Sequence, residues 1–238
     1  MSVAGGPDII EDGLLMYLDA GNRDSYPGTG TTWTDLSIPR YSGTAANPPV
    51  TFDSGYGGSI NANCQITISG SASAVKPANN FTYEVWARPA STIGLPTESN
   101  TGTGALGSSL PVIGALFQSG SDSGAGISLG TNGVVVMEHA NAYLPGLLVS
   151  SITISSTLFT NITVIYNNKQ PSLYVNGVFI KTGLTSTRAS VYADFRKIGY
   201  GDYNTFFGYI STAKVYNKTL SPTEILQNYN ALKGRFGL

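Results

Sequence analysis

Apolar and polar positions alternate with a period of two along several stretches of the chain, which indicates half-buried β-strands. The clearest stretch is 81–88, and proline at position 89 ends it because proline cannot donate to a strand ladder. Its apolar face consists of Phe81, Tyr83, Val85 and Ala87. Its opposite face consists of Thr82, Glu84, Trp86 and Arg88. Further strands are expected at 13–19, 112–117, 126–129, 134–138, 151–155, 161–166 and 209–216.

The pair Asn176-Gly177 predicts a β-hairpin, because both central residues of a type I′ turn need a positive φ. Across this turn we expect three pairs, namely Val175 with Val178, Tyr174 with Phe179 and Leu173 with Ile180. One face of the hairpin is then aliphatic, and the other carries an aromatic pair.

One helix is expected near the C-terminal end. Ser221 caps it, Pro222 takes the first helical position and Glu224 completes a capping box. We expect Gly234 to end the helix in a left-handed conformation. The face that packs on the protein is expected to carry Ile225, Leu226, Tyr229 and Leu232.

Several ordered motifs carry a resemblance to a known family. They are LYVNGV at 173–178, IG at 198–199, FGYI at 207–210, VYNKTLSPTEI at 215–225, and in the N-terminal half DGL, YLDAGN, YPG and TTWTDL. The chain resembles the laminin-G-like, or concanavalin A-like, jelly-roll proteins, in the version found in structural proteins of tailed bacteriophages. The resemblance implies an all-β, two-sheet antiparallel sandwich with one short C-terminal helix.

Domain organisation follows from the length of 238 residues, which fits one large β-sandwich. We expect a single domain at 11–238 and an N-terminal arm at 1–10 that contacts a sister subunit or a particle surface. Two segments depart from the family pattern. These are the turn at 38–41 and the long run 90–110, which is expected to be either mobile or a second contact with a partner.

Charged residues make up 11% of the chain, and the net charge is −1. This balance argues against binding of nucleic acid, which depends on clustered Lys and Arg. The sequence has no apolar run long enough to span a membrane and no recognisable signal peptide. Its single cysteine, Cys64, excludes an intrachain disulfide and is expected to be a small buried residue. We expect synthesis in a host cytoplasm and a place on the virion surface.

Glycoside hydrolysis needs two carboxylates close together, and the glycosidases of this fold carry them on alternate positions of one strand. Five glutamates are present, and none is followed two residues later by aspartate. Glu84, on the best strand, is followed by Trp86, so we expect Glu84 to be a salt-bridge or rim residue. The sole histidine, His139, is expected to be a solvated polar residue. The sequence thus favours a protein that is not an enzyme.

Two ligand classes stay open. The resemblance implies calcium as a candidate cofactor, held by carboxylates from separate loops, and Asp122 and Asp202 lie in suitable loops. The alternative is that each aspartate caps its own turn. A glycan site is the second candidate, because Tyr200, Asp202, Tyr203 and Asn204 combine aromatic faces with polar groups.

Our leading hypothesis is a structural protein of a phage particle, as an outer capsid decoration or a head or tail fibre component. Its expected partners are other virion proteins, including the major capsid protein, and further copies of itself. The alternative is a carbohydrate-binding adhesin that recognises glycans on the host surface.

Overall fold

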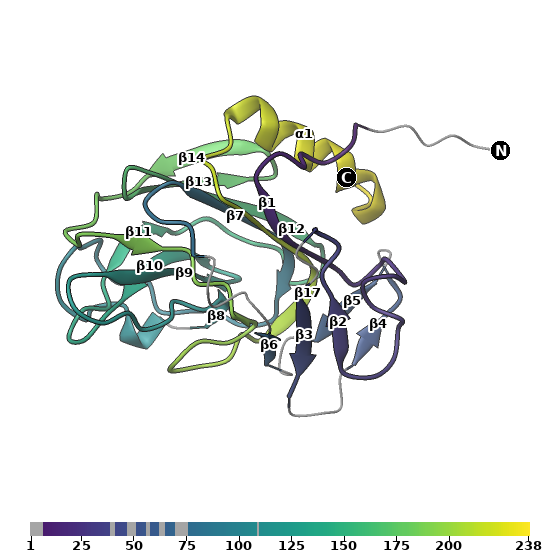
Figure 1. Ribbon diagram of the computed structural model, residues 1–238, viewed down its shortest axis with the longest axis horizontal. Coiled ribbons are helices and arrows are strands. Elements are labelled where there is room, and N and C mark those ends of the chain that lie inside the picture. The colour runs from purple at the N-terminus through teal and green to yellow at the C-terminus, as the bar shows by residue number, and fades with distance from the viewer. Residues whose placement is uncertain are drawn as a thin grey trace.

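The computed structural model describes residues 7–38, 41–46, 51–55, 58–61, 65–69, 76–108 and 110–238. Two β-sheets pack face to face, and a C-terminal helix lies over one of them (Figure 1). The predicted all-β sandwich with one short helix is confirmed. Within the described residues, no helix is long and apolar enough to cross a membrane.

The first sheet has eight strands in the described part of the chain. Its strands are β1 (Leu14–Asp19), β4 (Phe52–Asp53), β5 (Ser59–Asn61), β7 (Phe81–Pro89), β12 (Thr160–Asn167), β13 (Gln170–Val175), β14 (Val178–Thr182) and β17 (Gly208–Tyr216). Their spatial order is β14-β13-β12-β7-β17-β5-β4, and β1 also pairs with β17. All of these pairs are antiparallel.

The second sheet has nine described strands in the order β11-β10-β9-β8-β16-β6-β3-β2, with β15 pairing parallel to β9. The strands are β2 (Thr32–Thr34), β3 (Ser42–Ala45), β6 (Ile66–Ser69), β8 (Pro111–Ile113), β9 (Ser123–Gly130), β10 (Gly133–His139), β11 (Gly146–Ser150), β15 (Val191–Tyr192) and β16 (Lys197–Ile198). Two short 3₁₀ turns occupy Leu106–Ser108 and Gly234–Phe236.

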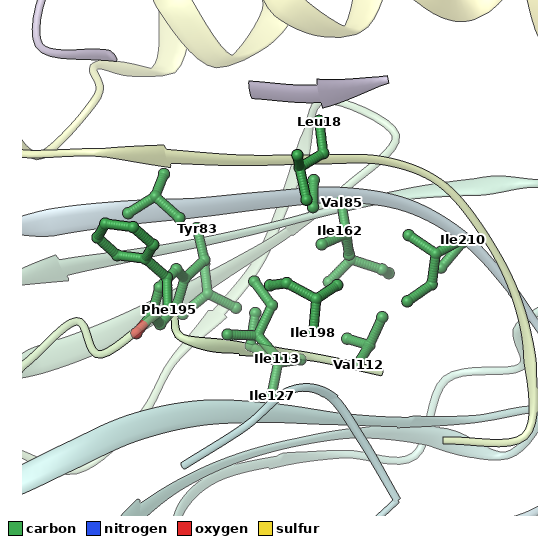
Figure 2. Packing of buried hydrophobic residues seen from close by; sticks show 14 of the residues in the cluster. Leu18, Tyr83, Val85, Val112, Ile113, Ile127, Ile162, Phe195, Ile198 and Ile210 are labelled. Carbon is green, nitrogen blue, oxygen red and sulfur yellow. The ribbon is translucent and has the colours of Figure 1, made fainter. Parts of the chain in front are cut away.

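The main hydrophobic core lies between the two sheets (Figure 2). Tyr83 and Val85 of β7 enter it from the first sheet, and Ile113 and Ile198 enter it from the second. The predicted apolar face of 81–88 is therefore confirmed, because all four of its residues belong to this core. Burial of this kind stabilises by roughly 1.5–3 kcal/mol for each large side chain.

The hairpin between β13 and β14 is confirmed in its turn and in two of its three pairs. Asn176 and Gly177 have φ values of 51° and 76°, as a type I′ turn requires. Tyr174 pairs with Phe179, and their rings meet edge to face at 5.5 Å. The third pair is wrong, since an irregularity shifts the register and Leu173 lies opposite Lys181.

Two strand predictions are also corrected. Residues 151–155 are irregular, and the strand is β11, whose Leu147 and Leu148 are fully buried. The predicted strand 112–117 ends at Ile113. A Cβ at Gly114 would lie 2.5 Å from the carbonyl oxygen of Tyr200, so the chain bends here against the loop 199–205.

The helix α1 (Pro222–Lys233) begins as predicted, with Ser221 and Glu224 forming both bonds of a capping box. Its end was predicted wrongly, because Gly234 is right-handed and the left-handed residue is Gly237, after a further 3₁₀ turn. Leu226, expected on the packed face, is 47% exposed. The sequence pattern missed Asn228, which is buried.

Helix α1 seals the outer face of the first sheet. The Trp86 ring of β7 stacks on Phe236 at 4.2 Å and on Tyr229 at 5.7 Å. Beneath the helix, Lys214 Nζ of β17 lies 2.8 Å from Glu84 Oε1, and neither side chain is more than 1% exposed. Glu84 is therefore a salt-bridge residue, as one reading of the sequence expected, but it does not lie at the rim.

The long run 90–108 covers part of the outer face of the second sheet. Ile93 and Ala105 from this run pack on Val135 and Met137 of β10. Glu98 accepts hydrogen bonds from the Val149 amide at 2.8 Å and from Lys181 at 2.5 Å. The run is thus held by strands of both sheets of its own domain, and its contact with a partner stays a prediction.

The start of the described chain also contacts its own domain. The Ile10 amide donates to Asn228 Oδ1 at 2.8 Å, and Gln227 donates to the Asp8 carbonyl at the same distance. The predicted arm at 1–10 therefore includes residues that lie against α1, while residues 1–6 are outside the described part.

Candidate functional site

The part of the second sheet that 90–108 leaves open carries two hollows. Thr67 and Lys197 alternate with the core residues Ile66, Ile68 and Ile198, so they point outward from β6 and β16. The larger hollow measures about 500 Å³. Its described lining consists of Thr67, Ile68, Leu116, Phe117, Arg196, Lys197 and Asp202. The smaller hollow, about 230 Å³, is lined by Gln65 and residues 200–205.

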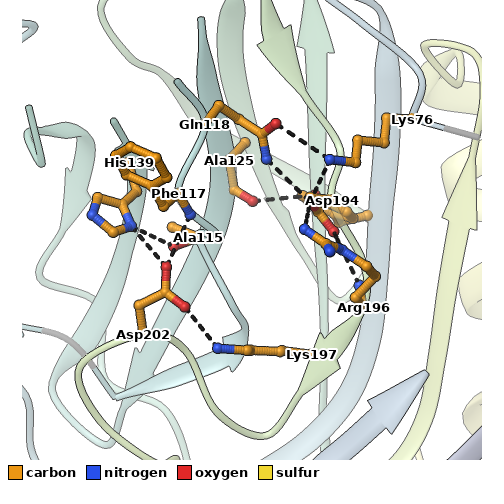
Figure 3. Close-up of polar contacts among 11 residues, drawn as sticks. Lys76, Ala115, Phe117, Gln118, Ala125, His139, Asp194, Arg196, Lys197 and Asp202 are labelled. Atoms are coloured by element: carbon orange, nitrogen blue, oxygen red, sulfur yellow. Dashed lines mark hydrogen bonds and ion pairs between the residues drawn. The ribbon is translucent and has the colours of Figure 1, made fainter. Parts of the chain in front are cut away.

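Asp202 borders both hollows and is held by three donors (Figure 3). Its Oδ2 accepts from the Phe117 amide at 2.9 Å and lies 3.1 Å from His139 Nδ1. Its Oδ1 accepts from Lys197 Nζ at 2.6 Å. The His139 contact, together with Lys197 and the Phe117 amide, lowers the pKa of Asp202 despite its partial burial. Asp202 is therefore a fixed carboxylate in a fixed loop.

His139, at the end of β10, positions this loop. It is 4% exposed, and its Nε2 lies 3.0 Å from the Tyr203 hydroxyl. The prediction of a solvated histidine is wrong, because the Phe117 ring meets the imidazole at 5.6 Å and the Tyr203 ring meets it at 5.1 Å. These two aromatic side chains are themselves 45% and 51% exposed.

A second carboxylate, Asp194, contacts Arg196, which lines the larger hollow (Figure 3). Its side chain is fully buried, and it accepts from Arg196 at 2.5 and 2.7 Å and from Lys76 at 3.0 Å. Burial favours the neutral acid, but the hydrogen bonds from the two cations prevail and lower the pKa of Asp194. Arg196 is therefore held in place by an ionised carboxylate.

The four predicted glycan residues lie together around the smaller hollow. The Tyr200 hydroxyl and Thr67 Oγ1 are 2.5 Å apart, and the Gly201 amide donates to the Asn204 carbonyl at 2.9 Å. The suggestion that Asp202 caps its own turn is wrong, since its partners lie on three other segments. The geometry brings these residues together but leaves their binding role a prediction.

The predicted calcium ligands are not joined in the structure. Asp122 precedes β9, and no hydrogen bond or ion pair connects it with Asp202 across the described residues. Over the same residues, no group of three or more His, Cys, Asp or Glu could hold a metal ion. Asp202 instead faces the ammonium of Lys197, so the arrangement is better suited to an ion pair than to a cation site.

Glu138, one of the five glutamates considered for glycoside hydrolysis, is buried inside the sandwich. Hydroxyls of Ser123 and Ser186 lie 2.8 and 2.5 Å from its Oε2. The Tyr143 and Tyr166 hydroxyls donate to it at 3.3 Å. Burial raises the pKa of Glu138, and these hydrogen bonds only partly oppose the rise.

Cys64, expected to be a small buried residue, lies outside the described residues.

Sequence reasoning missed four residues of this site, namely Thr67, Phe117, Arg196 and Lys197. Two of them carried a signal, because Arg196 and Lys197 are the one pair of adjacent basic residues in a chain with 13 Lys and Arg. Thr67 and Phe117 carried none, since each depends on pairing between strands distant in sequence.

A comparison with protein-family profiles matches residues 62–226 to the concanavalin A-like lectin/glucanases superfamily. The chain belongs to this superfamily. The match includes strands β6 to β17, which form most of both sheets, and the loop 199–205, while β1 to β5 precede it. A search among curated proteins gives no match.

Solved structures share the fold of this concanavalin A-like domain. The binding domain of Paraclostridial Mosquitocidal Protein 1 has a TM-score of 0.64 at 18% identity, covering 93% of this chain and 52% of that one. The ligand binding domain of botulinum neurotoxin serotype D, in complex with N-acetylneuraminic acid, has a TM-score of 0.64 at 13% identity, with coverages of 92% and 51%. The chain thus spans about half the length of these two domains.

A third structure is similar over its whole length. Domain 4 of AbnA, an arabinanase from Geobacillus stearothermophilus, in complex with arabinotriose, has a TM-score of 0.57 at 15% identity. The alignment covers 91% of this chain and 98% of that domain. At these identities the likeness establishes the fold.

Proposed function

We propose that this chain is a non-enzymatic glycan-binding domain and that the two hollows around Asp202 form its binding site. The observation that carries the proposal is the exposure of Phe117 and Tyr203, whose rings both contact the buried His139. Exposed aromatic side chains at a hollow with convergent polar groups are typical of ligand sites.

The chemistry of the hollows suits a sugar ring. A pyranose has an apolar face of C–H groups and an edge of hydroxyls. Phe117 and Tyr203 offer the apolar surface, while Asp202, Lys197 and Thr67 offer hydroxyl partners. Because Asp202 borders both hollows, an oligosaccharide can occupy the two together.

The comparisons support this class of ligand, though not a particular sugar. Two of the similar structures are complexes, one with N-acetylneuraminic acid and the other with arabinotriose. The first is the ligand binding domain of a neurotoxin, and the second is one domain of an arabinanase.

The absence of catalysis is part of the proposal and follows from where the carboxylates lie. Glycoside hydrolysis requires two carboxyl groups on either side of one bond. Glu84 is sealed under α1, Glu138 is enclosed between the sheets, and Asp194 is fully buried against two cations. Asp202 is then the one carboxylate among the described residues that line these two hollows.

We propose further that the domain is carried on the surface of a phage particle, where it contacts other virion proteins and copies of itself. The support is the ordered motif set in both halves of the chain, which resembles tailed-phage structural proteins. Electron microscopy with labelled antibody on purified particles, together with mass spectrometry, tests this placement. Particles that lack the chain would overturn it and leave the glycan proposal standing.

Binding to a glycan array, followed by titration calorimetry on the hits, tests the glycan site. We expect Phe117→Ala and Tyr203→Ala to weaken binding about tenfold or more, as removal of a central aromatic contact commonly does. Phe179→Ala is the matched control, because Phe179 is 53% exposed on the distant β14. Equal losses in all three variants, or no glycan binding by the wild type, would overturn the proposal.

A further inference from the structure

We infer that the larger hollow selects glycans that carry an anionic group, a carboxylate or a sulfate, over neutral ones. This inference rests on the proposed glycan site and adds the class of sugar. It follows from the charges at the hollow, the unused donors of two cations and the hydrogen bonds that the neighbouring carboxylate already accepts.

The charge at the hollow is opposite in sign to that of the whole chain. Lys76, Arg196 and Lys197 meet two carboxylates, Asp194 and Asp202, in the contacts of Figure 3. One positive charge remains uncompensated, whereas the chain as a whole carries −1. His139 adds a second positive charge whenever it is protonated.

Arg196 has N–H donors that its contact with Asp194 does not use. Its Nε and Nη2 are used by Asp194, and its Nη1 has no hydrogen-bond partner in the described structure. The side chain is 37% exposed at the hollow. A guanidinium fixed by a buried carboxylate on one side is oriented in advance for an anion on the other.

Lys197 supplies a second donor group beside it. Its ammonium gives one hydrogen bond to Asp202 and lies 5.0 Å from the Tyr200 ring centre. An ammonium has three N–H groups, so donors remain for a ligand. Asp202 repels an anion less than an open carboxylate would, because Lys197, His139 and the Phe117 amide already occupy both of its oxygens.

Matched ligand pairs test the inference on the wild-type protein. The probes are an oligogalacturonide and its methyl ester, sialyllactose and its methyl ester, and a sulfated galactan and its desulfated form. We expect at least one anionic member to bind about tenfold or more tightly than its neutral partner, as for a charge-assisted hydrogen bond. Its affinity should fall as sodium chloride rises from about 0.05 M to about 0.5 M. The pairs that respond distinguish a carboxylate from a sulfate.

Single substitutions test which residues cause the preference for the anionic ligand. Lys197→Gln and Arg196→Lys should reduce the preference for the anionic member, while Lys233→Gln on α1 should leave it unchanged. Arg196→Lys keeps a cation next to Asp194, and its thermal unfolding shows whether it folds. Lys197→Gln removes a partly exposed group and provides the second variant.

The outcomes separate the two proposals. An anionic preference that disappears in Lys197→Gln and persists in Lys233→Gln supports the inference. Equal binding of charged and neutral partners, or a preference that survives both site variants, overturns the inference while glycan binding stands. Binding of no glycan overturns the proposed function together with it.

Discussion

The two outer faces of the sandwich carry the same kind of ion pair in opposite surroundings. Under α1, Glu84 and Lys214 lie 2.8 Å apart with side chains 1% and 0% exposed. At the hollow, Asp202 and Lys197 lie 2.6 Å apart with side chains 26% and 28% exposed. Judged by the distance between the charged atoms alone, the two ion pairs would be expected to have similar strength.

Burial makes the difference between them. A charge that loses its partner in a water-free site has no other means of stabilisation, so removing one member of a buried pair is costly. A partly exposed pair is worth about 0–1 kcal/mol, since water replaces the lost partner. The pair under α1 therefore constrains the fold, while the pair at the hollow can exchange its contacts with a ligand.

The largest expected effect comes from breaking the buried pair. Lys214→Met leaves Glu84 buried without its cation and bonded to Asn161 and Asn228, which should cost about 3–5 kcal/mol in unfolding free energy. Lys197→Met at the hollow should cost about 0–1 kcal/mol. Urea denaturation of both variants gives the comparison, and similar losses would contradict the contrast between the faces.

A double variant then identifies the cause. If the unpaired charge produces the loss, Glu84→Gln combined with Lys214→Met should be more stable than Lys214→Met alone. A double variant that is less stable than the single one would attribute the loss to packing.

The next effect concerns the hairpin turn, which packs against the sealed face. Gly177 has a φ of 76°, and a Cβ there would lie 3.2–3.3 Å from Leu226 and Tyr229 of α1. Gly177→Val should cost about 3 kcal/mol, as backbone strain and crowding against the helix add together. Gly120→Val, at a φ of 70° with open space around it, should cost about 1–2 kcal/mol from strain alone. Equal decreases in melting temperature for the two variants would show that crowding against α1 adds nothing to the cost at Gly177.

Glu138 provides a third environment, because it is buried and bonded to hydroxyls, with no cation within hydrogen-bond reach among the described residues, and its effect should depend on pH. Its pKa is raised in the folded protein, so folding is favoured while it is protonated. This contribution is complete below pH 4.5, the ordinary value for Glu, and is lost as pH rises through the folded pKa.

Denaturation at several pH values checks the sign. Relative to Glu138→Gln, the wild type should lose roughly 1–2 kcal/mol as pH rises from acidic to neutral. The opposite slope, or parallel profiles, would mean that the four hydroxyls fully compensate the burial of the carboxylate.

The smallest expected effect concerns the N-terminal cap of helix α1. Ser221→Ala removes the side-chain cap of α1 and should lower the unfolding free energy by about 1 kcal/mol. Thr223→Ala, in the exposed first turn, should leave stability nearly unchanged. A smaller loss for Ser221 than for Thr223 would mean that the cap does not hold the helix.

Local rules in the sequence predicted the elements that depend on them. The alternation of 81–88, the Asn176-Gly177 turn and the Ser221 cap each involve residues close together in the chain, and all three are confirmed. Two errors are local, at the end of α1 and in the third hairpin pair, and others arise where segments distant in sequence determine the packing. Leu226 was expected on the packed face of α1, but Asn228 is buried there and bonds Glu84 and Tyr216 on the sheet below.

The candidate site shows the same division. The loop 199–205 was recognised by its composition, since aromatic and polar residues gather within one turn. The roles of its neighbours were not predictable, because His139 comes from β10, Phe117 from a bend after β8 and Lys197 from β16. His139 is brought into contact with Phe117, Asp202 and Tyr203 only by the folding of these strands.

The hydrogen bond from the Phe117 amide to the Asp202 side chain has a consequence for measurement. A backbone amide whose acceptor belongs to a loop side chain exchanges with solvent only when that loop moves away. The deuterium uptake of this one amide therefore reports how often the loop 199–205 opens. A ligand that bridges the hollows should slow that uptake, and the ratio of rates gives the coupling between loop closure and occupancy without any label on the sugar.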